Sequence, residues 1–232
     1  MARIFRLTAV LISALALAAI LAVPVEAAAS SEPWPTSARV LAVPQYYQHH
    51  SLDCETAALQ MALAYRGIHI AENTLLAAEN IDWRAPVWNA SGFHWGDPFT
   101  NFVGNPDGSE RALTGYGTYA PNIARVARRY GGQVLFAGRG LGPLSVYRQI
   151  LAGRPVIAWV SFDWRWHQTS SYIAFDGVRV PFGSPYEHAV TLSGVGPNSV
   201  LVNNPEYGKQ WIARSTFEAA YATFGNMAVV LS

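Results

Sequence analysis

The stretch that decides the fold covers residues 43–63, which read Val43-Pro44-Gln45-Tyr46-Tyr47-Gln48-His49-His50-Ser51-Leu52-Asp53-Cys54-Glu55-Thr56-Ala57-Ala58-Leu59-Gln60-Met61-Ala62-Leu63. From Ala57 onward the apolar side chains recur at helical spacing. Asp53 is a suitable N-cap residue, and Gly67 is a typical stop signal. The pattern therefore predicts a helix over 53–66 whose first turn contains Cys54.

Cys54 is the only cysteine among 232 residues, so a disulfide within the chain and a multi-cysteine zinc site are excluded. The N–H groups and dipole at a helix start favour a thiolate, whereas the neighbouring Asp53 and Glu55 oppose one. Catalysis by this cysteine would therefore require a further partner, such as a histidine. The alternative is a buried cysteine that acts as a small apolar side chain.

A glutamine lies six residues before this cysteine. In that position the side-chain amide of Gln48 can donate a hydrogen bond to an oxyanion, together with the backbone N–H of Cys54. Gln45 is a competing candidate for the same role.

Six histidines are available as a general base: His49, His50, His69, His94, His167 and His188. His188 opens an apolar strand in which packing would fix its orientation, and this suits a general base. The next strand ends in Asn203-Asn204-Pro205. Either asparagine could accept the imidazole N–H and hold the tautomer, and Asn-Pro is also a common turn pair.

The N-terminal residues have the features of an export signal. Arg3 and Arg6 precede an apolar run, and the segment closes on Ala27-Ala28-Ala29. We predict a signal peptide over 1–29, with an uncleaved membrane anchor as the alternative, followed by a linker over 30–38 and one domain over 39–232. The protein is then expected to be secreted or located in the cell envelope.

Charge excludes some classes of partner. The chain carries 16 basic and 15 acidic side chains, and removal of residues 1–29 would leave 14 of each. A nucleic-acid binder needs a basic surplus, so no nucleic acid and no membrane beyond the signal segment are expected as partners. We expect a monomer, and we expect no metal or other cofactor because the histidines and carboxylates do not have metal-ligand spacing.

The order of elements predicts an α+β fold rather than alternating βαβ units. Helices are expected over 53–66, 71–79, 121–130, 143–152 and 215–223, the last of them opened by a capping box at Ser215 and Glu218. Strands are expected over 39–43, 133–136, 155–162, 188–195, 199–203, 210–213 and 227–231. Residues 82–118 are expected to form a long functional loop. This loop and the segment 164–167 would line a substrate cleft, with Trp95, Asp97, Tyr116 and Trp166 as substrate-binding residues.

These motifs together resemble the papain-like superfamily, and within it the C-thirty-nine-like cysteine peptidases, which are relatives of bacteriocin-leader-processing peptidases. The resemblance covers residues 40–231. It is carried by 43–48, 53–63, Gly153-Arg154-Pro155-Val156-Ile157, Glu187-His188-Ala189-Val190 and Val202-Asn203-Asn204-Pro205.

The resemblance implies a papain-like fold and a cysteine peptidase that acts on a peptide or protein substrate through a thioester. It also implies that Cys54 is the nucleophile, His188 the general base, Asn204 the orienting residue and Gln48 the oxyanion donor. Two positions depart from the family pattern: Glu55 stands where glycine is frequent, and Asn204 stands where aspartate is frequent. Two other functions remain open, namely peptidoglycan amide hydrolysis and an inactive exported binding module of the same fold.

Overall fold

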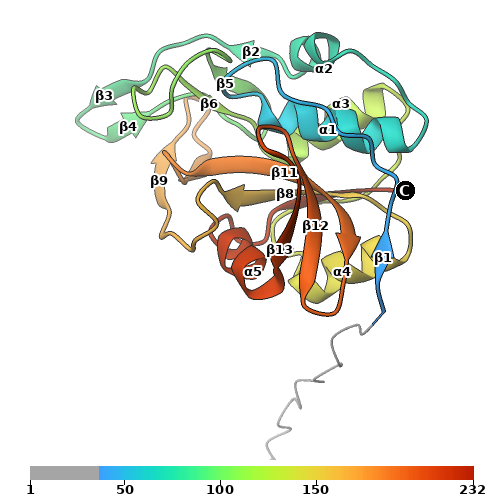
Figure 1. Ribbon diagram of the computed structural model, residues 1–232. Coiled ribbons are helices and arrows are strands. Elements are labelled where there is room, and N and C mark those ends of the chain that lie inside the picture. Colours follow the sequence, from blue (N-terminus) through green and yellow to red (C-terminus); the bar gives the residue numbers. More distant parts are fainter. Residues whose placement is uncertain (1–36) are drawn as a thin grey trace, which may run out of the picture. The chain divides into compact units, whose positions relative to one another are not determined.

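The computed structural model describes residues 37–232 (Figure 1). The helices in this range are α1 (Cys54–Tyr65), α2 (Glu72–Ala78), α3 (Ala120–Arg129), α4 (Pro143–Leu151) and α5 (Arg214–Ala222). The strands are β1 (Arg39–Val40), β2 (Ile81–Asp82), β3 (Val87–Asn89), β4 (Gly92–His94), β5 (Phe102–Gly104), β6 (Gly115–Gly117), β7 (Val134–Gly138), β8 (Val156–Ser161), β9 (Ser170–Ile173), β10 (Arg179–Phe182), β11 (Glu187–Val195), β12 (Ser199–Asn204), β13 (Gly208–Ala213) and β14 (Ala228–Leu231).

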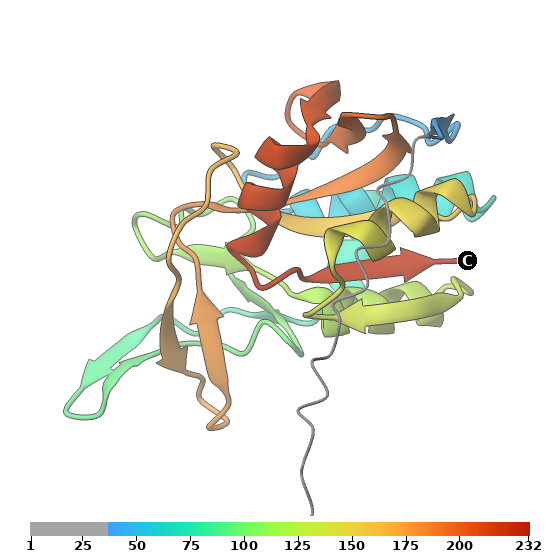
Figure 2. The ribbon, with the colours of Figure 1, turned by 90° about the horizontal axis from the view of Figure 1, so that it is seen from below.

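A seven-stranded sheet forms the centre of the fold. Its strand order is β13-β12-β11-β8-β14-β7, and the short β1 pairs with β11. Every pairing in this sheet is antiparallel. Helices α1 and α3 cover one face and α4 and α5 the other, as Figures 1 and 2 show from two directions. The sheet is thus enclosed between two helical layers.

Strand β8 shows why both faces must be covered. All six of its residues are buried. Ile157 and Trp159 belong to the apolar cluster beneath α1 and α3, whereas Val156, Ala158 and Val160 belong to the cluster beneath α4 and α5. Since successive side chains of a strand point to opposite faces, a continuous apolar run fills both cores. Each large side chain buried in this way contributes roughly 1.5–3 kcal/mol.

The predicted α+β class is confirmed, and the long helices and strands are found close to their expected positions. The expected strand 39–43 is shorter, because only Arg39 and Val40 pair with β11. The prediction of a capping box at Ser215 and Glu218 is wrong, because α5 begins at Arg214 and has no side-chain cap hydrogen bond. The Glu218 carboxylate instead accepts the Tyr147 hydroxyl at 2.8 Å.

The expectation of a continuous loop over 82–118 is also wrong. The segment contains the end of β2 and all of β3 to β6. Strands β9 and β10, which follow β8, were not predicted either. Strands β2 to β6 are two or three residues long. Elements this short do not establish an alternating pattern, and it is tertiary pairing that stabilises them.

The predicted signal peptide lies outside the described residues, as does the linker up to residue 36. Within residues 37–232, no helix has the length and apolar character needed to span a bilayer.

Candidate active site

Cys54 is the first residue of α1, as the sequence predicts. The helix packs against β11, where the Thr191 hydroxyl donates to the Ala58 carbonyl at 2.8 Å. The backbone N–H of Ala189 donates to the Cys54 Sγ at 3.3 Å. Helix and strand together therefore fix the position of the thiol, which is 4% exposed.

His188 and Asn204 meet across adjacent strands, with the imidazole Nε2 3.1 Å from Asn204 Oδ1. The same Oδ1 accepts the backbone N–H groups of Glu206, at 2.9 Å, and Tyr207, at 3.3 Å. Because two backbone donors identify this atom as the amide oxygen, the imidazole must donate from Nε2. In the neutral ring Nδ1 then carries the lone pair and can accept a proton.

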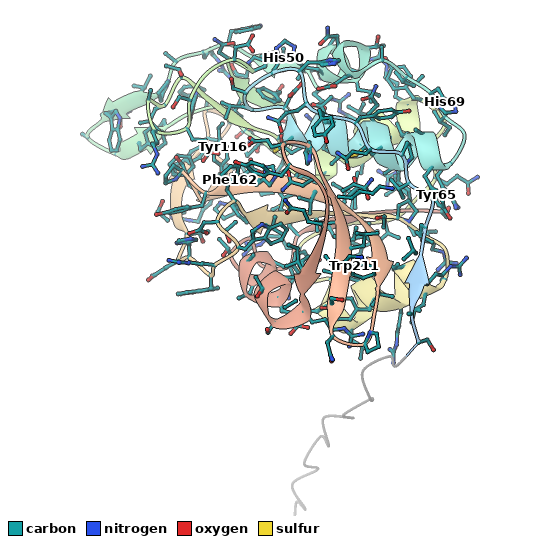
Figure 3. All side chains as sticks on the ribbon, viewed as in Figure 1. His50, Tyr65, His69, Tyr116, Phe162 and Trp211 are labelled. Atoms are coloured by element: carbon teal, nitrogen blue, oxygen red, sulfur yellow. The ribbon has the colours of Figure 1, made fainter. Side chains whose placement is uncertain are left out.

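The surroundings of His188 keep its ring neutral. The residue is 2% exposed. The ring of Phe162, which is labelled in Figure 3, stands edge-on to the imidazole with the ring centres 5.2 Å apart. Burial lowers the pKa of His188 to about 4, against the opposing effect of the Asn204 hydrogen bond. At neutral pH this histidine is therefore a proton acceptor.

The neighbouring Asn203 has a different role. Its Oδ1 accepts the Ser193 hydroxyl at 2.6 Å, and its Nδ2 donates to the carbonyls of Val43 and Pro44. Successive residues of β12 point to opposite faces of the sheet. Asn204 therefore contacts the imidazole, while Asn203 anchors the segment before α1.

The two candidate glutamines also separate. Gln48 lines a cavity together with Cys54, whereas Gln45 does not. The Gln45 amide instead donates to the carbonyls of Tyr46 and Asn204. The Gln48 Nε2 donates to the carbonyls of His50, at 2.9 Å, and Ser51, at 3.2 Å. To serve an oxyanion, Gln48 would have to exchange or share one of these two hydrogen bonds.

Buried carboxyl groups surround the thiol, and no sequence pattern predicts that they meet there. The Cys54 thiol donates to Glu55 Oε2 at 3.4 Å, and Glu55 Oε1 accepts the backbone N–H of Thr118 at 2.6 Å. A Cβ atom at Gly117 would clash with the same Oε1, so this approach needs glycine there. Glu187 completes the group, since one of its carboxylate oxygens lies within 4.8 Å of both the Cys54 Sγ and a Glu55 oxygen. Such a set of three ligand atoms could hold a cation.

These neighbours raise the pKa of the Cys54 thiol well above its ordinary value. Burial is the largest cause, and the charges of Glu55 and Glu187 add to it. The Ala189 N–H opposes the shift. The favourable effect expected from the helix start is therefore outweighed, and a neutral thiol and a neutral imidazole line the same cavity.

The cavity in front of the thiol has a volume of about 320 Å³, within the range of small-ligand sites. Cys54, His188 and Gln48 line it. The other lining residues are Ser51, Leu52, Gly108, Ser109, Glu110, Arg111, Phe162, Pro185, Glu187 and Glu206.

The four residues predicted to bind substrate do not line this cavity. Trp95 and Tyr116 are fully buried in the core, where their polar atoms bond to the Arg84 carbonyl and the Tyr119 hydroxyl. Their large apolar area makes burial more favourable than exposure in a cleft. The expected aromatic cleft wall is thus mostly core, and Phe162 is the aromatic residue of the cavity.

Asp97 and Trp166 lie elsewhere for different reasons. The Asp97 carboxylate accepts the Phe99 N–H and the Thr100 hydroxyl, so it closes a local turn. Trp166 is 58% exposed in the loop after β8. Residues 108–111 of the segment 82–118, which is expected to line the cleft, do line the cavity. Their polar, glycine-containing sequence does not single them out within that segment.

Among the histidines, only His188 lines the cavity. His50, labelled in Figure 3, bridges Asp107 and Asn73 through its two ring nitrogens, at 3.0 and 3.1 Å. His167 bonds to Asp163 at 2.8 Å and stacks on Tyr186.

Comparison with known proteins agrees with this architecture. The model of the Peptidase_C39 like family matches residues 40–229. The chain belongs to this peptidase C39-like family. It is 31% identical over 186 residues to the uncharacterised protein YvpB of Bacillus subtilis, covering 77% of this chain and 68% of YvpB.

A solved structure of a C39-like protein is similar as well. A crystal structure described as a candidate C39-like peptidase from Bacillus anthracis superposes with a TM-score of 0.70 at 25% identity, covering 84% of this chain and 98% of that one. A double-glycine-motif protease in complex with a leader peptide gives a TM-score of 0.48 at 16% identity, covering 86% and 96%. The predicted papain-like C39 fold is confirmed.

Proposed function

We propose that this protein is an exported cysteine peptidase that hydrolyses peptide or amide bonds through Cys54, His188 and Asn204. One observation carries the proposal: a neutral imidazole, held by Asn204 at 3.1 Å, lines the same cavity as a thiol at the start of a helix. Family and fold are those of peptidases, and they support the same reaction class.

In the first half of the proposed reaction, the Cys54 S–H turns from Glu55 Oε2 toward His188. His188 Nδ1 takes the proton as the Cys54 Sγ attacks the substrate carbonyl carbon. The carbonyl electrons move to oxygen, and the Cys54 backbone N–H and the Gln48 amide stabilise the resulting anion. His188 then gives the proton to the leaving amine. The C–N bond breaks, and a thioester remains on Cys54.

In the second half, His188 removes a proton from water as the water attacks the thioester carbonyl. Collapse of the second oxyanion breaks the C–S bond, and the proton returns from His188 to the sulfur. Asn204 keeps the ring in one tautomer throughout. As an amide it stabilises the transient imidazolium less than a carboxylate would.

The test is trapping of the acyl-enzyme. Mass spectrometry after acid quench should show peptide adducts on Cys54, and hydrolysis should disappear in Cys54→Ala and His188→Ala. His94→Ala, which changes a histidine of the β3–β4 hairpin, is the matched control and should keep full activity. Hydrolysis that persists in folded Cys54→Ala would place the chemistry elsewhere. Parallel assays on a peptide library and on intact peptidoglycan separate a peptidase from a wall amide hydrolase.

An inactive binding module is the second candidate, and the raised pKa of the thiol is the observation that favours it. A reactive thiol should be alkylated by iodoacetamide in the folded protein. Labelling that occurs only after denaturation, combined with tight peptide binding, would favour the binding module.

Export is proposed from the N-terminal sequence, namely two arginines, an apolar run and a small-residue end. N-terminal sequencing of the protein from medium and envelope fractions should find a chain that begins after residue 29. An intact N-terminus in the membrane fraction would indicate an uncleaved anchor.

A further inference from the structure

Two acidic residues that line the cavity have carboxyl oxygens without a partner. Glu187 and Glu110 line the cavity and are only 6% and 8% exposed. Glu187 Oε1 and Glu110 Oε2 are buried and have no hydrogen-bond partner among the described residues. A buried carboxyl oxygen without a donor is costly, so two of them on residues that line one cavity indicate that a donor arrives with a ligand.

The acidic residues that line the cavity have no buried cationic partner. Glu206 adds a third carboxylate at the exposed rim, and the single arginine of the lining, Arg111, is itself exposed. The histidine of the site is neutral, as burial lowers its pKa to about 4. The cavity lining therefore offers Glu110 and Glu187 no buried cation.

The distance to the reacting sulfur limits where the ligand can be. A Glu187 oxygen lies within 4.8 Å of the Cys54 Sγ. A donor bound to Glu187 therefore lies beside the bond that the thiol would attack. Ammonium and guanidinium groups are the donors that such carboxylates bind most strongly.

From this geometry we propose that the cavity selects substrates that carry a cationic group next to the scissile carbonyl, held by Glu110 and Glu187. This inference rests on the proposed peptidase function and specifies its substrate. Two sources share the chemistry, namely a lysine or arginine side chain and a free α-amine on the residue that supplies the carbonyl. Burial raises the pKa of both carboxyls, and that of Glu110 to about 8, so binding of a cation would also release protons.

The experiment uses peptidyl acyloxymethyl ketones on the full-length protein. The Cys54 thiol displaces the carboxylate leaving group of such a probe, and mass spectrometry measures the fraction of protein that carries the adduct. One pair of probes ends in lysine or in its neutral analogue norleucine. A second pair carries alanine with a free or an acetylated α-amine. We expect the cationic member of one pair to label Cys54 at least tenfold faster than its neutral partner.

Variants assign the preference to the two carboxyl groups. Glu110→Gln and Glu187→Gln should reduce the ratio between the labelling rates of cationic and neutral probes toward one. Asp176→Asn removes an exposed acid that lies outside the cavity lining and should leave the ratio unchanged. Binding of lysine peptide to Cys54→Ala, followed by calorimetry in buffers of different ionisation enthalpy, should show proton release.

The outcomes separate this inference from the function on which it depends. Equal labelling by all four probes would overturn the cationic preference and leave the peptidase proposal standing. Absence of labelling by every probe in the folded protein would overturn both. A preference that survives Glu110→Gln and Glu187→Gln would overturn the assignment to these carboxyls.

Discussion

Asn204 Oδ1 accepts three hydrogen bonds at once, from His188 Nε2 at 3.1 Å and from the backbone N–H groups of Glu206 and Tyr207. The two backbone donors hold the oxygen in place, and the oxygen in turn fixes which nitrogen of the imidazole carries the proton. The turn after β12 thus determines the protonation pattern of the proposed general base.

Asn204→Asp should shift the acidic limb of the pH–activity profile upward. A carboxylate beside His188 would raise the imidazole pKa from about 4 by roughly one to three units. His188 must be neutral to accept the thiol proton, so activity would then be lost at a higher pH as the solution is acidified. The measurement is kcat/KM between pH 3 and 8.

The matched control is Asn203→Ala. It removes hydrogen bonds to Ser193, Val43 and Pro44, so it should lower thermal stability but leave the acidic limb where it is. An acidic limb that stays unchanged in Asn204→Asp would mean that this residue does not control the base.

Gln48→Ala should lower kcat by roughly 10²–10³ with little change in KM, because an oxyanion donor acts mainly in the transition state. Gln45→Ala should keep kcat and cost about 1 kcal/mol of stability, since its amide bonds only to backbone carbonyls. Steady-state kinetics on both variants, with unfolding curves, makes the comparison. Equal kcat values would remove Gln48 from the mechanism.

Glu55→Gln should make the thiol more reactive. Glu55 accepts the Cys54 S–H, and its charge raises the thiol pKa. Glutamine keeps an acceptor for the Thr118 N–H but has no charge, so the thiol pKa should fall. A fall of one unit raises the thiolate fraction about tenfold wherever the thiol is mostly protonated. The readout is the iodoacetamide rate at pH 8.

Glu55→Asp is the control for that experiment, because it retains the charge at the same position. Its alkylation rate should stay closer to that of the unaltered protein. If Glu55→Gln reacts no faster while remaining folded, the charge of Glu55 is not what suppresses the thiolate.

Stability should fall as the pH rises from about 6.5 to 9. Burial raises the pKa of Asp53 to about 9, that of Glu110 to about 8 and that of Glu55 to about 7. In this window the unfolded chain has these groups ionised while the folded chain still holds protons. Each proton held only by the folded state costs about 1.4 kcal/mol of stability per pH unit. Urea unfolding at pH 6.5, 7.5 and 8.5 measures the slope.

The window starts at 6.5 because His188 acts in the opposite direction below it: its folded-state pKa is lowered, so the unfolded chain binds the extra proton between about pH 4 and 6.5. Glu110→Gln should flatten the slope above pH 6.5. A stability that is constant or rises from pH 6.5 to 9 would mean that these carboxyls are ionised in the folded protein.

Part of the candidate site could be predicted because it depends on local sequence. A helix beginning near Cys54 follows from apolar spacing and a stop at Gly67. The strand that contains His188 follows from an apolar run, and the strand that contains Asn204 from a turn signal before it. The sequence left two choices open. The choice between Asn203 and Asn204 depends on which face of the strand each side chain occupies, and the choice between Gln45 and Gln48 depends on the path of the loop before the helix.

The remainder of the site depends on packing between distant segments. Glu55 is adjacent to Cys54 in sequence, but its burial requires Gly117 and Thr118 to pack against it. Glu110 and Glu187 reach the cavity from a loop and a strand that are far apart along the chain. Hydrophobic periodicity cannot predict that two such distant residues line the same cavity.

By itself the sequence determined the class of fold and the order of a cysteine, a histidine and an asparagine along it, because helix and strand signals are local. Only the tertiary structure decided that large aromatics such as Trp95 belong to the core and that carboxyl groups lie around the thiol. The physical reason is that burial and pKa depend on which atoms surround a group. In a folded chain, segments that are far apart in sequence supply most of those atoms.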